Sequence, residues 1–355
     1  MFKKYAEQVA RLTPDLAFHI SCPDLSRPGE RNHGPWWLES HAFYNKHNRI
    51  IATEIGCNGM PEAESIRRFI PENEPLPAGQ SYHYHFLHLQ KAPDVKKHWA
   101  FFGPETLWEH SQSSMFAQAD ITGYQMEHYR RGWPEKSGCF FWQYNEPWPT
   151  FTWSLIDYYS VPKIAMYRLA KSNAPVMLSL RDNDWCVTDG VWKGSLYLCN
   201  DREAFAGSAE LRLVAQDGTG LGKWEKTGDF AGGVSLLGEW EAPVPSGMII
   251  IAVMTLRDAE GKTLFRTERL YGAPDYKTAF RSSPADLTAS FRAVPGGIAV
   301  SLCNRGSNAA MMVRAALPDV DAKAVYWHEN YVTLAPGETR ELFAECSAVP
   351  EKVQI

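Results

Sequence analysis

The sequence changes its character near residue 173, and this change limits the folds that the chain can adopt. Before it, helix-like segments alternate with strand-like ones, which is typical of an α/β layered or barrel fold. After it, short strands separated by Gly and Asp turns dominate, which is typical of β-sandwiches. We therefore expect an α/β part over 1–173, a β-sandwich over 174–275 and a smaller β-sandwich over 284–355.

The patterns also predict individual elements. In the first part, the expected helices span 1–12, 61–69, 115–131 and 161–170, and the expected strands span 16–21, 49–54 and 138–144. In the two β-rich parts, the expected strands span 176–180, 194–199, 209–215, 248–254, 287–292, 297–303, 311–317, 324–328 and 339–345. A linker is expected at 274–283, between the two sandwiches.

Composition excludes several classes of function. The formal net charge is −5 and Lys and Arg form no long run, so binding to nucleic acid or to an anionic membrane is not expected. No window is apolar and long enough to span a bilayer, and the first residues lack the apolar core of a signal peptide, so a cytoplasmic location is expected. The seven Cys include no C-x-x-C pair, which disfavours a zinc ribbon or a redox motif and fits reduced thiols.

Glu54 is the most informative single position. An apolar strand-like run ends in this carboxylate, and Gly56 and a Gly/Asn-containing loop follow. In a parallel barrel the catalytic groups sit at the carboxyl ends of strands, and a carboxylate there can attack an anomeric carbon. The alternative is a structural Glu that caps a turn or pairs with an Arg.

A second group of candidates follows the strand expected at 138–144. Trp142 and Trp148 flank two amides, Gln143 and Asn145, in a Pro-rich exit segment. Exposed indoles stack on the C–H faces of a pyranose, while amides bond its hydroxyls, so this composition suits a sugar pocket. The alternative is an ordinary exit loop whose amides cap turns, just as most of the 13 Trp are expected in the core.

Histidines supply two further candidates. His33 lies in a Gly/Pro loop beside the paired Trp36 and Trp37, so His33 and Trp37 could line a cleft, although a lone His is more often structural. Three more histidines alternate with aromatic residues: His83, His85 and His88. Along one strand face they could bind a metal, but a loop or helix is favoured, and no metal site is predicted.

These motifs resemble those of the β-mannosidase branch of glycoside hydrolase family 2, and the resemblance runs through nearly the whole chain. Thr53-Glu54-Ile55-Gly56 is similar to the nucleophile motif of that family, Ser-Glu-Phe/Tyr-Gly. The segment of its last barrel strand is matched by Trp142-Gln143, Asn145-Glu146, Trp148-Pro149, Trp153-Ser154, Asp157-Tyr158 and Lys163. The end of its final immunoglobulin-like domain is matched by 330–338.

The resemblance implies the C-terminal half of a (β/α)8 TIM barrel, followed by two immunoglobulin-like β-sandwiches. It implies that Glu54 is the nucleophile of a retaining exo-β-glycosidase, which needs no cofactor. Trp142 would line the subsite of the terminal sugar with His33 nearby, and Asn145 and Trp148 would shape that pocket less directly. Thr53 and Ile55 depart from the family motif, which leaves the preferred sugar open.

A retaining enzyme also needs a second carboxylic acid as acid/base. The family carries it at the end of an earlier barrel strand, so the resemblance implies that this Glu lies upstream of Met1, in a missing N-terminal half of the polypeptide. Asn145-Glu146-Pro147 is tempting, because Asn-Glu-Pro marks the acid in many related barrels. We reject Glu146, because it follows the nucleophile strand and occupies the position of a non-catalytic acid of the family.

We therefore expect a β-mannosidase-like glycoside hydrolase, or a fragment of one that is weakly active alone, acting on an oligosaccharide or another β-glycoside. Two alternatives stay open. The same family could act on a glucosaminide, galactoside or glucuronide, since the pocket loops depart from the pattern. The chain could instead be a non-catalytic carbohydrate-binding protein with Trp platforms on its sandwiches.

Overall fold

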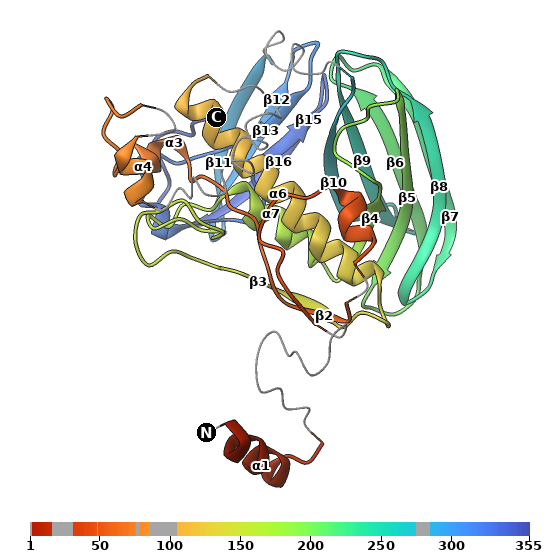
Figure 1. The fold of residues 1–355 in the computed structure, drawn as a ribbon. Helices are drawn as coiled ribbons and strands as arrows, with labels where there is room; N and C mark the ends of the chain where they lie inside the picture. Colours follow the sequence, from red (N-terminus) through yellow and green to blue (C-terminus); the bar gives the residue numbers. More distant parts are fainter. Residues whose placement is uncertain (1, 16–30, 48, 76–78, 86–104, 275–284) are drawn as a thin grey trace.

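We describe the fold from a computed structural model, which covers residues 2–15, 31–47, 49–75, 79–85, 105–274 and 285–355 (Figure 1). The first part contains α1 (Phe2–Leu12), β1 (Arg31–His33), α2 (His41–Asn45), β2 (Ile51–Ile55), α3 (Ala63–Ile66), α4 (Gln80–Tyr84), α6 (Leu107–Arg131), β3 (Gly138–Phe141) and α7 (Ile164–Ser172). None of the helices in these ranges is long and apolar enough to cross a membrane.

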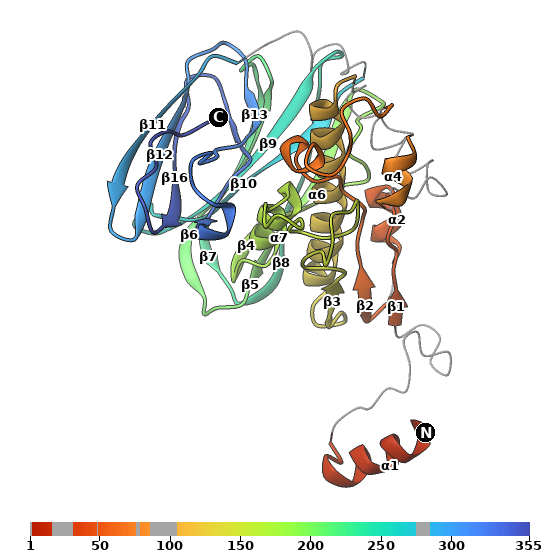
Figure 2. The same cartoon turned by 90° about the vertical axis from the view of Figure 1, so that its left-hand side faces the viewer.

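The three strands of the first part form one parallel sheet in the order β1-β2-β3. His33 pairs with Glu54, and Ile51 pairs with Gly138, so the carboxyl ends of all three strands meet at one edge of the sheet. Figure 2 shows the long helix α6 beside this sheet, with α7 packed on α6. The parallel sheet with its covering helices confirms the expected α/β character of this part.

Several predicted boundaries were wrong. Helix α6 begins at Leu107 rather than Met115, since the expected start relied on apolar spacing and the first turns of α6 bury polar side chains instead. The predicted helix 61–69 is only the short α3, and β3 ends at Phe141 rather than at Tyr144. The strand predicted at 16–21 lies outside the described residues.

The first β-sandwich packs two sheets face to face, with strand orders β10-β9-β6-β7 and β4-β5-β8 (Figure 1). The strands are β4 (Val176–Arg181), β5 (Val191–Asn200), β6 (Phe205–Ala215), β7 (Gly220–Phe230), β8 (Gly233–Pro243), β9 (Ile249–Asp258) and β10 (Thr263–Gly272). The sequence patterns assigned neither β7, β8 nor β10. Strand β7 is largely exposed and Gly-containing, so its pairing with β6 rather than its own propensity makes it a strand.

The second β-sandwich has sheets in the orders β11-β12-β16-β14 and β13-β15. Its elements are β11 (Leu287–Val294), β12 (Gly297–Asn304), β13 (Ala310–Val313), the 3₁₀ turn η2 (Ala322–Ala324), β14 (Val325–Trp327), β15 (Val332–Leu334) and β16 (Thr339–Cys346). Alternate residues of these strands, such as Ile298, Val300 and Leu302, form its core. The strand predicted at 311–317 ends at Val313, and almost all of the linker predicted at 274–283 lies outside the described residues.

Candidate active site

Backbone hydrogen bonds hold the ends of the three parallel strands together. Gly34 N donates to the Glu54 carbonyl at 2.8 Å, and Gly56 N donates to the Pro35 carbonyl at 3.2 Å. On the other side, Trp142 N donates to the Ile55 carbonyl at 2.8 Å. The exit of β2 is therefore fixed between the exits of β1 and β3, as expected for a site at the carboxyl end of a parallel sheet.

Glu54 and His33 face one another at this edge. Glu54 Oε2 lies 3.8 Å from His33 Nε2, which is beyond hydrogen-bonding distance but places both side chains at one spot on the sheet edge. The Glu54 side chain is 28% exposed, so a ligand can reach a carboxylate that rests on a rigid strand. The structure thus brings together two residues that were predicted for the site from distant parts of the sequence.

Gly56 allows the close approach between β2 and the Trp142 segment. A Cβ atom at position 56 would lie 2.6 Å from the Trp142 carbonyl oxygen and 3.1 Å from Cδ1 of Trp153. Trp153 in turn donates from Nε1 to the Trp36 carbonyl at 3.0 Å. The Trp153 ring and the Trp142 carbonyl therefore pack closely against Gly56, the second residue after the candidate nucleophile.

Tryptophans follow both strands that flank β2, namely Trp36 and Trp37 after β1 and Trp142 after β3. Trp142 is 45% exposed directly after β3, and the peptide bond that follows it is cis. Trp36 stands edge-on to His33, with ring centroids 4.7 Å apart. Trp37 is also exposed and donates from Nε1 to Glu39 at 2.9 Å. Trp36 and Trp153 were not among the predicted site residues, although Trp36 precedes the predicted Trp37 and Trp153 belongs to a matched motif.

Two predicted substrate-binding residues lie in other surroundings. Trp148 stacks on His85, with centroids 5.3 Å apart, and meets Tyr84 edge-on at 5.9 Å. Asn145 is exposed and lines a cleft that reaches the second β-sandwich. Their assignment to the sugar pocket stays a prediction.

Glu146 is buried in a polar cluster. Its Oε1 lies 3.0 Å from Lys163 Nζ and accepts hydrogen bonds from Thr152 Oγ1 at 3.1 Å and from Ser154 Oγ. The Lys163 ammonium also donates to the Gly59 carbonyl at 2.9 Å. A carboxylate that is buried against a lysine and two hydroxyls cannot reach the leaving group of a bound substrate, which supports the rejection of Glu146 as acid/base.

A metal role for the alternating histidines gains no support. His83 lies in the short helix α4, His85 follows it and bonds the Pro149 carbonyl, and His88 lies outside the described residues. Among the residues that the structure covers, no group of three or more His, Cys, Asp or Glu side chains could hold a metal ion.

Comparisons with known proteins point to one group of enzymes. A family model described as the exo-β-D-glucosaminidase Ig-fold domain matches residues 271–355. The β-mannosidase B of Neosartorya fischeri is 29% identical over 245 residues, and that of Aspergillus flavus is 28% identical over 239 residues. These alignments cover 62% and 60% of this chain and 28% of each relative, so the chain spans well under half of their length.

Solved structures agree on the fold. The β-D-mannosidase of Dictyoglomus thermophilum superposes with a TM-score of 0.71 at 20% identity, over 91% of this chain and 40% of that enzyme. The exo-chitosanase of Amycolatopsis orientalis gives a TM-score of 0.67 at 19% identity, over 88% of this chain and 42% of that enzyme. These relatives are glycoside hydrolases. By sequence this chain is therefore similar to β-mannosidases, and it shares the fold of the corresponding parts of the solved β-D-mannosidase and exo-chitosanase.

Proposed function

We propose that this chain carries the nucleophile of a retaining exo-β-glycoside hydrolase of the β-mannosidase type. The observation that carries the proposal is the position of Glu54. Its carboxylate ends the middle strand of a parallel sheet, open to solvent, beside His33 and between loops that expose Trp37 and Trp142. Rigid strand ends with aromatic surroundings are suited to attack on a bound sugar.

The chemistry follows from that position. Glu54 attacks the anomeric carbon of the terminal sugar, the bond to the leaving oxygen breaks while the acid/base carboxyl protonates that oxygen, and a covalent glycosyl ester forms. Water then attacks the same carbon from the other face, which releases the sugar with retained configuration and frees Glu54. His33 lies within 4 Å of the carboxylate and can form a hydrogen bond with a hydroxyl of the bound sugar. Trp142 offers a ring on which the sugar stacks.

We further propose that the acid/base carboxyl belongs to a part of the polypeptide outside these residues. A retaining pair requires carboxyl groups roughly 5 Å apart, and Glu146 is already held by Lys163. The solved relatives extend far beyond the matched region. The sheet β1-β2-β3 would then be part of the C-terminal half of a (β/α)8 barrel, which pairs the outer edges of β1 and β3 with further strands.

Covalent trapping tests the role of Glu54. The chain is joined to the upstream part of the D. thermophilum enzyme and treated with a 2-deoxy-2-fluoro-β-mannosyl fluoride, whose good leaving group needs little acid assistance. Mass spectrometry of the digest is expected to find the sugar on the peptide that contains Glu54. Glu54→Gln is expected to abolish labelling and to lower aryl-mannoside hydrolysis by at least roughly a thousandfold. A label on another carboxylate would contradict the proposal.

Activity of the isolated chain tests whether the acid/base carboxyl lies outside these residues. The chain alone is expected to hydrolyse an aryl β-mannoside poorly, and the fused protein is expected to do so well. Full activity of the isolated chain that also survives Glu146→Gln would show that a different acid in these residues completes the pair.

A second candidate is an exo-β-glucosaminidase, which the match of residues 271–355 to the glucosaminidase Ig-fold domain favours. The fused protein is compared on p-nitrophenyl β-mannoside and p-nitrophenyl β-glucosaminide, with the galactoside and the glucuronide as further substrates. A higher kcat/KM on the glucosaminide would replace the mannosidase assignment. No turnover and no labelling with any of them would favour a carbohydrate-binding protein.

A further inference from the structure

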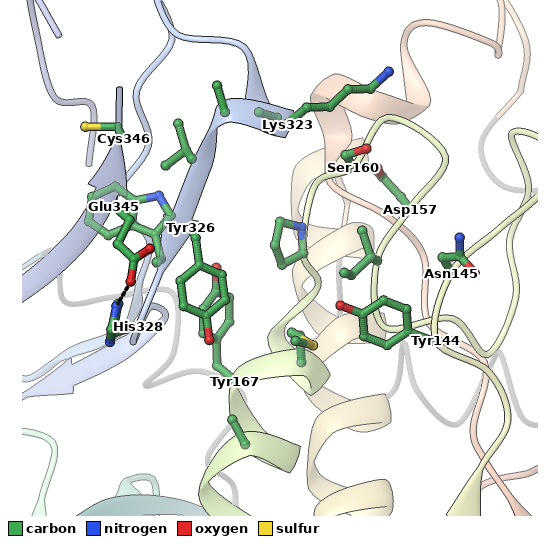
Figure 3. Close-up of a pocket in the computed structure, with 18 of the residues that line it drawn as sticks. Tyr144, Asn145, Asp157, Ser160, Tyr167, Lys323, Tyr326, His328, Glu345 and Cys346 are labelled. Carbon is green, nitrogen blue, oxygen red and sulfur yellow. Dashed lines mark hydrogen bonds and ion pairs between the residues drawn. The ribbon is translucent and has the colours of Figure 1, made fainter. Parts of the chain in front are cut away.

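A second cleft lies between the loop after β3, helix α7 and the edge of the second β-sandwich (Figure 3). Its volume is about 780 Å³, within the range of roughly 300–1,000 Å³ that is usual for ligand sites. Glu54 is not among the described residues that line it. We call it the C-terminal cleft, and its chemistry has no role in the catalytic proposal.

One wall is the exposed edge strand β14 with its neighbour β16. Trp327 points into the sandwich core, so Tyr326 and His328 on either side of it point outward. Tyr326 is 57% exposed and pairs with Glu345 across the strands. Glu345 Oε1 lies 2.7 Å from His328 Nε2, which fixes both groups beside the Tyr326 ring. This wall therefore offers a flat aromatic face next to ordered polar groups.

The opposite wall comes from the loops that follow β3. Tyr144 is exposed and lies across the cleft from Tyr326 in Figure 3, and Asn145 follows it. Asp157 Oδ1 accepts hydrogen bonds from Tyr159 N at 2.9 Å and from Val161 N at 2.8 Å, which orders the second loop of this wall. Both walls are thus preformed, and each presents an exposed tyrosine.

We propose that the C-terminal cleft binds a chain of several β-linked sugars, as a second carbohydrate site separate from Glu54. Tyrosine rings stack on the C–H faces of pyranoses, and their hydroxyls stay hydrated when the site is empty. The carboxylate, imidazole and amide groups of Glu345, His328 and Asn145 bond sugar hydroxyls as acceptors and donors. Rings on two opposed walls suit successive sugars of one chain better than a single sugar. Binding here requires neither Glu54 nor turnover.

Calorimetry with the 355-residue chain tests this site. Glu54→Gln serves as the background so that the ligand is not consumed, and mannotetraose and the glucosamine tetramer are titrated separately. Tyr326→Ala and Tyr144→Ala are each expected to weaken binding by roughly tenfold. Tyr326→Phe keeps the ring and is expected to retain most of the affinity. Trp142→Ala, which alters the catalytic pocket, is expected to leave this binding unchanged.

Tyr5→Ala is the matched control, because Tyr5 is 54% exposed on α1, which lies apart from α7 and β16 in Figure 1. Hydrogen–deuterium exchange of the unsubstituted chain gives a readout that needs no variant: residues 322–328 and 144–147 are expected to be protected by the sugar. The proposal is overturned if neither sugar binds, if both Ala variants bind as well as the control, or if protection falls elsewhere. Exclusive loss in Trp142→Ala would assign the binding to the catalytic pocket instead.

Discussion

At the scale of single residues, two carboxylates in the first part have opposite surroundings. Glu54 is partly exposed at a strand end beside His33, whereas Glu146 is buried against Lys163. Both stand in segments that look catalytic in the sequence. The exposure of the two side chains distinguishes their roles. A nucleophile has to contact the sugar, and a carboxylate buried in an ion pair cannot do so.

Glu146→Gln is expected to lower the free energy of unfolding by about 3–5 kcal/mol, because it leaves the Lys163 ammonium buried without a counter-charge. Glu146→Gln combined with Lys163→Met is expected to recover part of this loss, since the unpaired charge is removed. Urea unfolding followed by Trp fluorescence measures both. A Glu146→Gln variant that keeps full stability but loses hydrolysis in the fused protein would instead assign Glu146 a catalytic role.

Gly56→Ala is expected to destabilise the chain by roughly 1–3 kcal/mol, because the new Cβ would meet the Trp142 carbonyl oxygen at 2.6 Å. The backbone has to shift at the point where Glu54 and Trp142 are aligned, so hydrolysis by the fused protein should fall as well. Gly220→Ala is the matched control, as nothing lies within 4 Å of a Cβ there. Equal unfolding midpoints for Gly56→Ala and Gly220→Ala would show that position 56 is not tightly packed against the Trp142 carbonyl.

At the scale of elements, α6 shows how a cap and buried polar side chains can establish the beginning of a helix. Its N-cap Thr106 accepts from Glu109 N at 3.2 Å, and Glu109 accepts from Thr106 N at 2.8 Å, which forms a capping box. The buried polar residues that follow bond the α3 region, as in the hydrogen bond of Ser111 Oγ to the Pro61 carbonyl at 2.6 Å. Helix α6 is thereby anchored under the loop that follows Glu54.

Thr106→Ala is expected to cost about 1 kcal/mol of unfolding free energy through the loss of this cap. Thr106→Ser keeps a hydroxyl at the same position and is expected to stay close to the parent chain. Hydrogen exchange adds a local readout: amides of the first turn of α6 should exchange faster in Thr106→Ala alone. Unchanged exchange in that turn would mean that tertiary packing, and not the cap, holds the start of the helix.

At the scale of the whole molecule, a buried charged cluster joins the α/β part to the first β-sandwich. His41 in α2 lies 2.8 Å from Asp120 in α6 and also bonds Asp182 of the sandwich. Arg269 of β10 lies 3.1 Å from Asp182 and 3.4 Å from Asp120. Tyr124 stacks on the His41 ring at 3.9 Å. Asp120 and Asp182 each contact both His41 and Arg269. Breaking one contact therefore leaves buried charge on both sides of the interface.

This cluster predicts a pH dependence of stability. Burial opposes the charge of His41, but Asp182 and Asp120 outweigh burial and raise its pKa to about 9, from an ordinary value of 6.5. A group whose pKa is higher in the folded state stabilises fully below its unfolded pKa and loses that contribution as the pH rises. The His41 contribution is therefore present below pH 6.5 and lost as the pH rises through about 9.

The measurement compares unfolding free energies of the parent chain and of His41→Asn across this range. The parent is expected to lose stability more steeply between pH 6.5 and pH 9 than the variant, whose absolute stability is lower throughout. His328→Asn is the control, as His328 is exposed on the second sandwich. Parallel pH profiles for the parent chain and His41→Asn would contradict a charged His41 at this interface.

The sequence by itself determined the elements whose signals are local. The apolar run before Glu54 predicted β2, the run before Trp142 predicted β3 although not its end, and the alternating strands after residue 174 predicted the sandwiches. These signals reside in neighbouring residues, because the period of an apolar pattern depends on the backbone geometry of one segment. The match of Glu54 and Trp142 to family motifs has the same local origin.

Only the tertiary structure decided which distant residues meet. His41 and Asp182 are 141 positions apart, and the cleft joins Tyr144 to Tyr326. The exposed strand β7 and the polar segment 110–114 of α6 also became regular only through their partners. Burial and pairing energies arise from such contacts between segments, so no window of the sequence contains them. For the same reason, the exposure of Glu54 and the burial of Glu146 became distinguishable only in the folded chain.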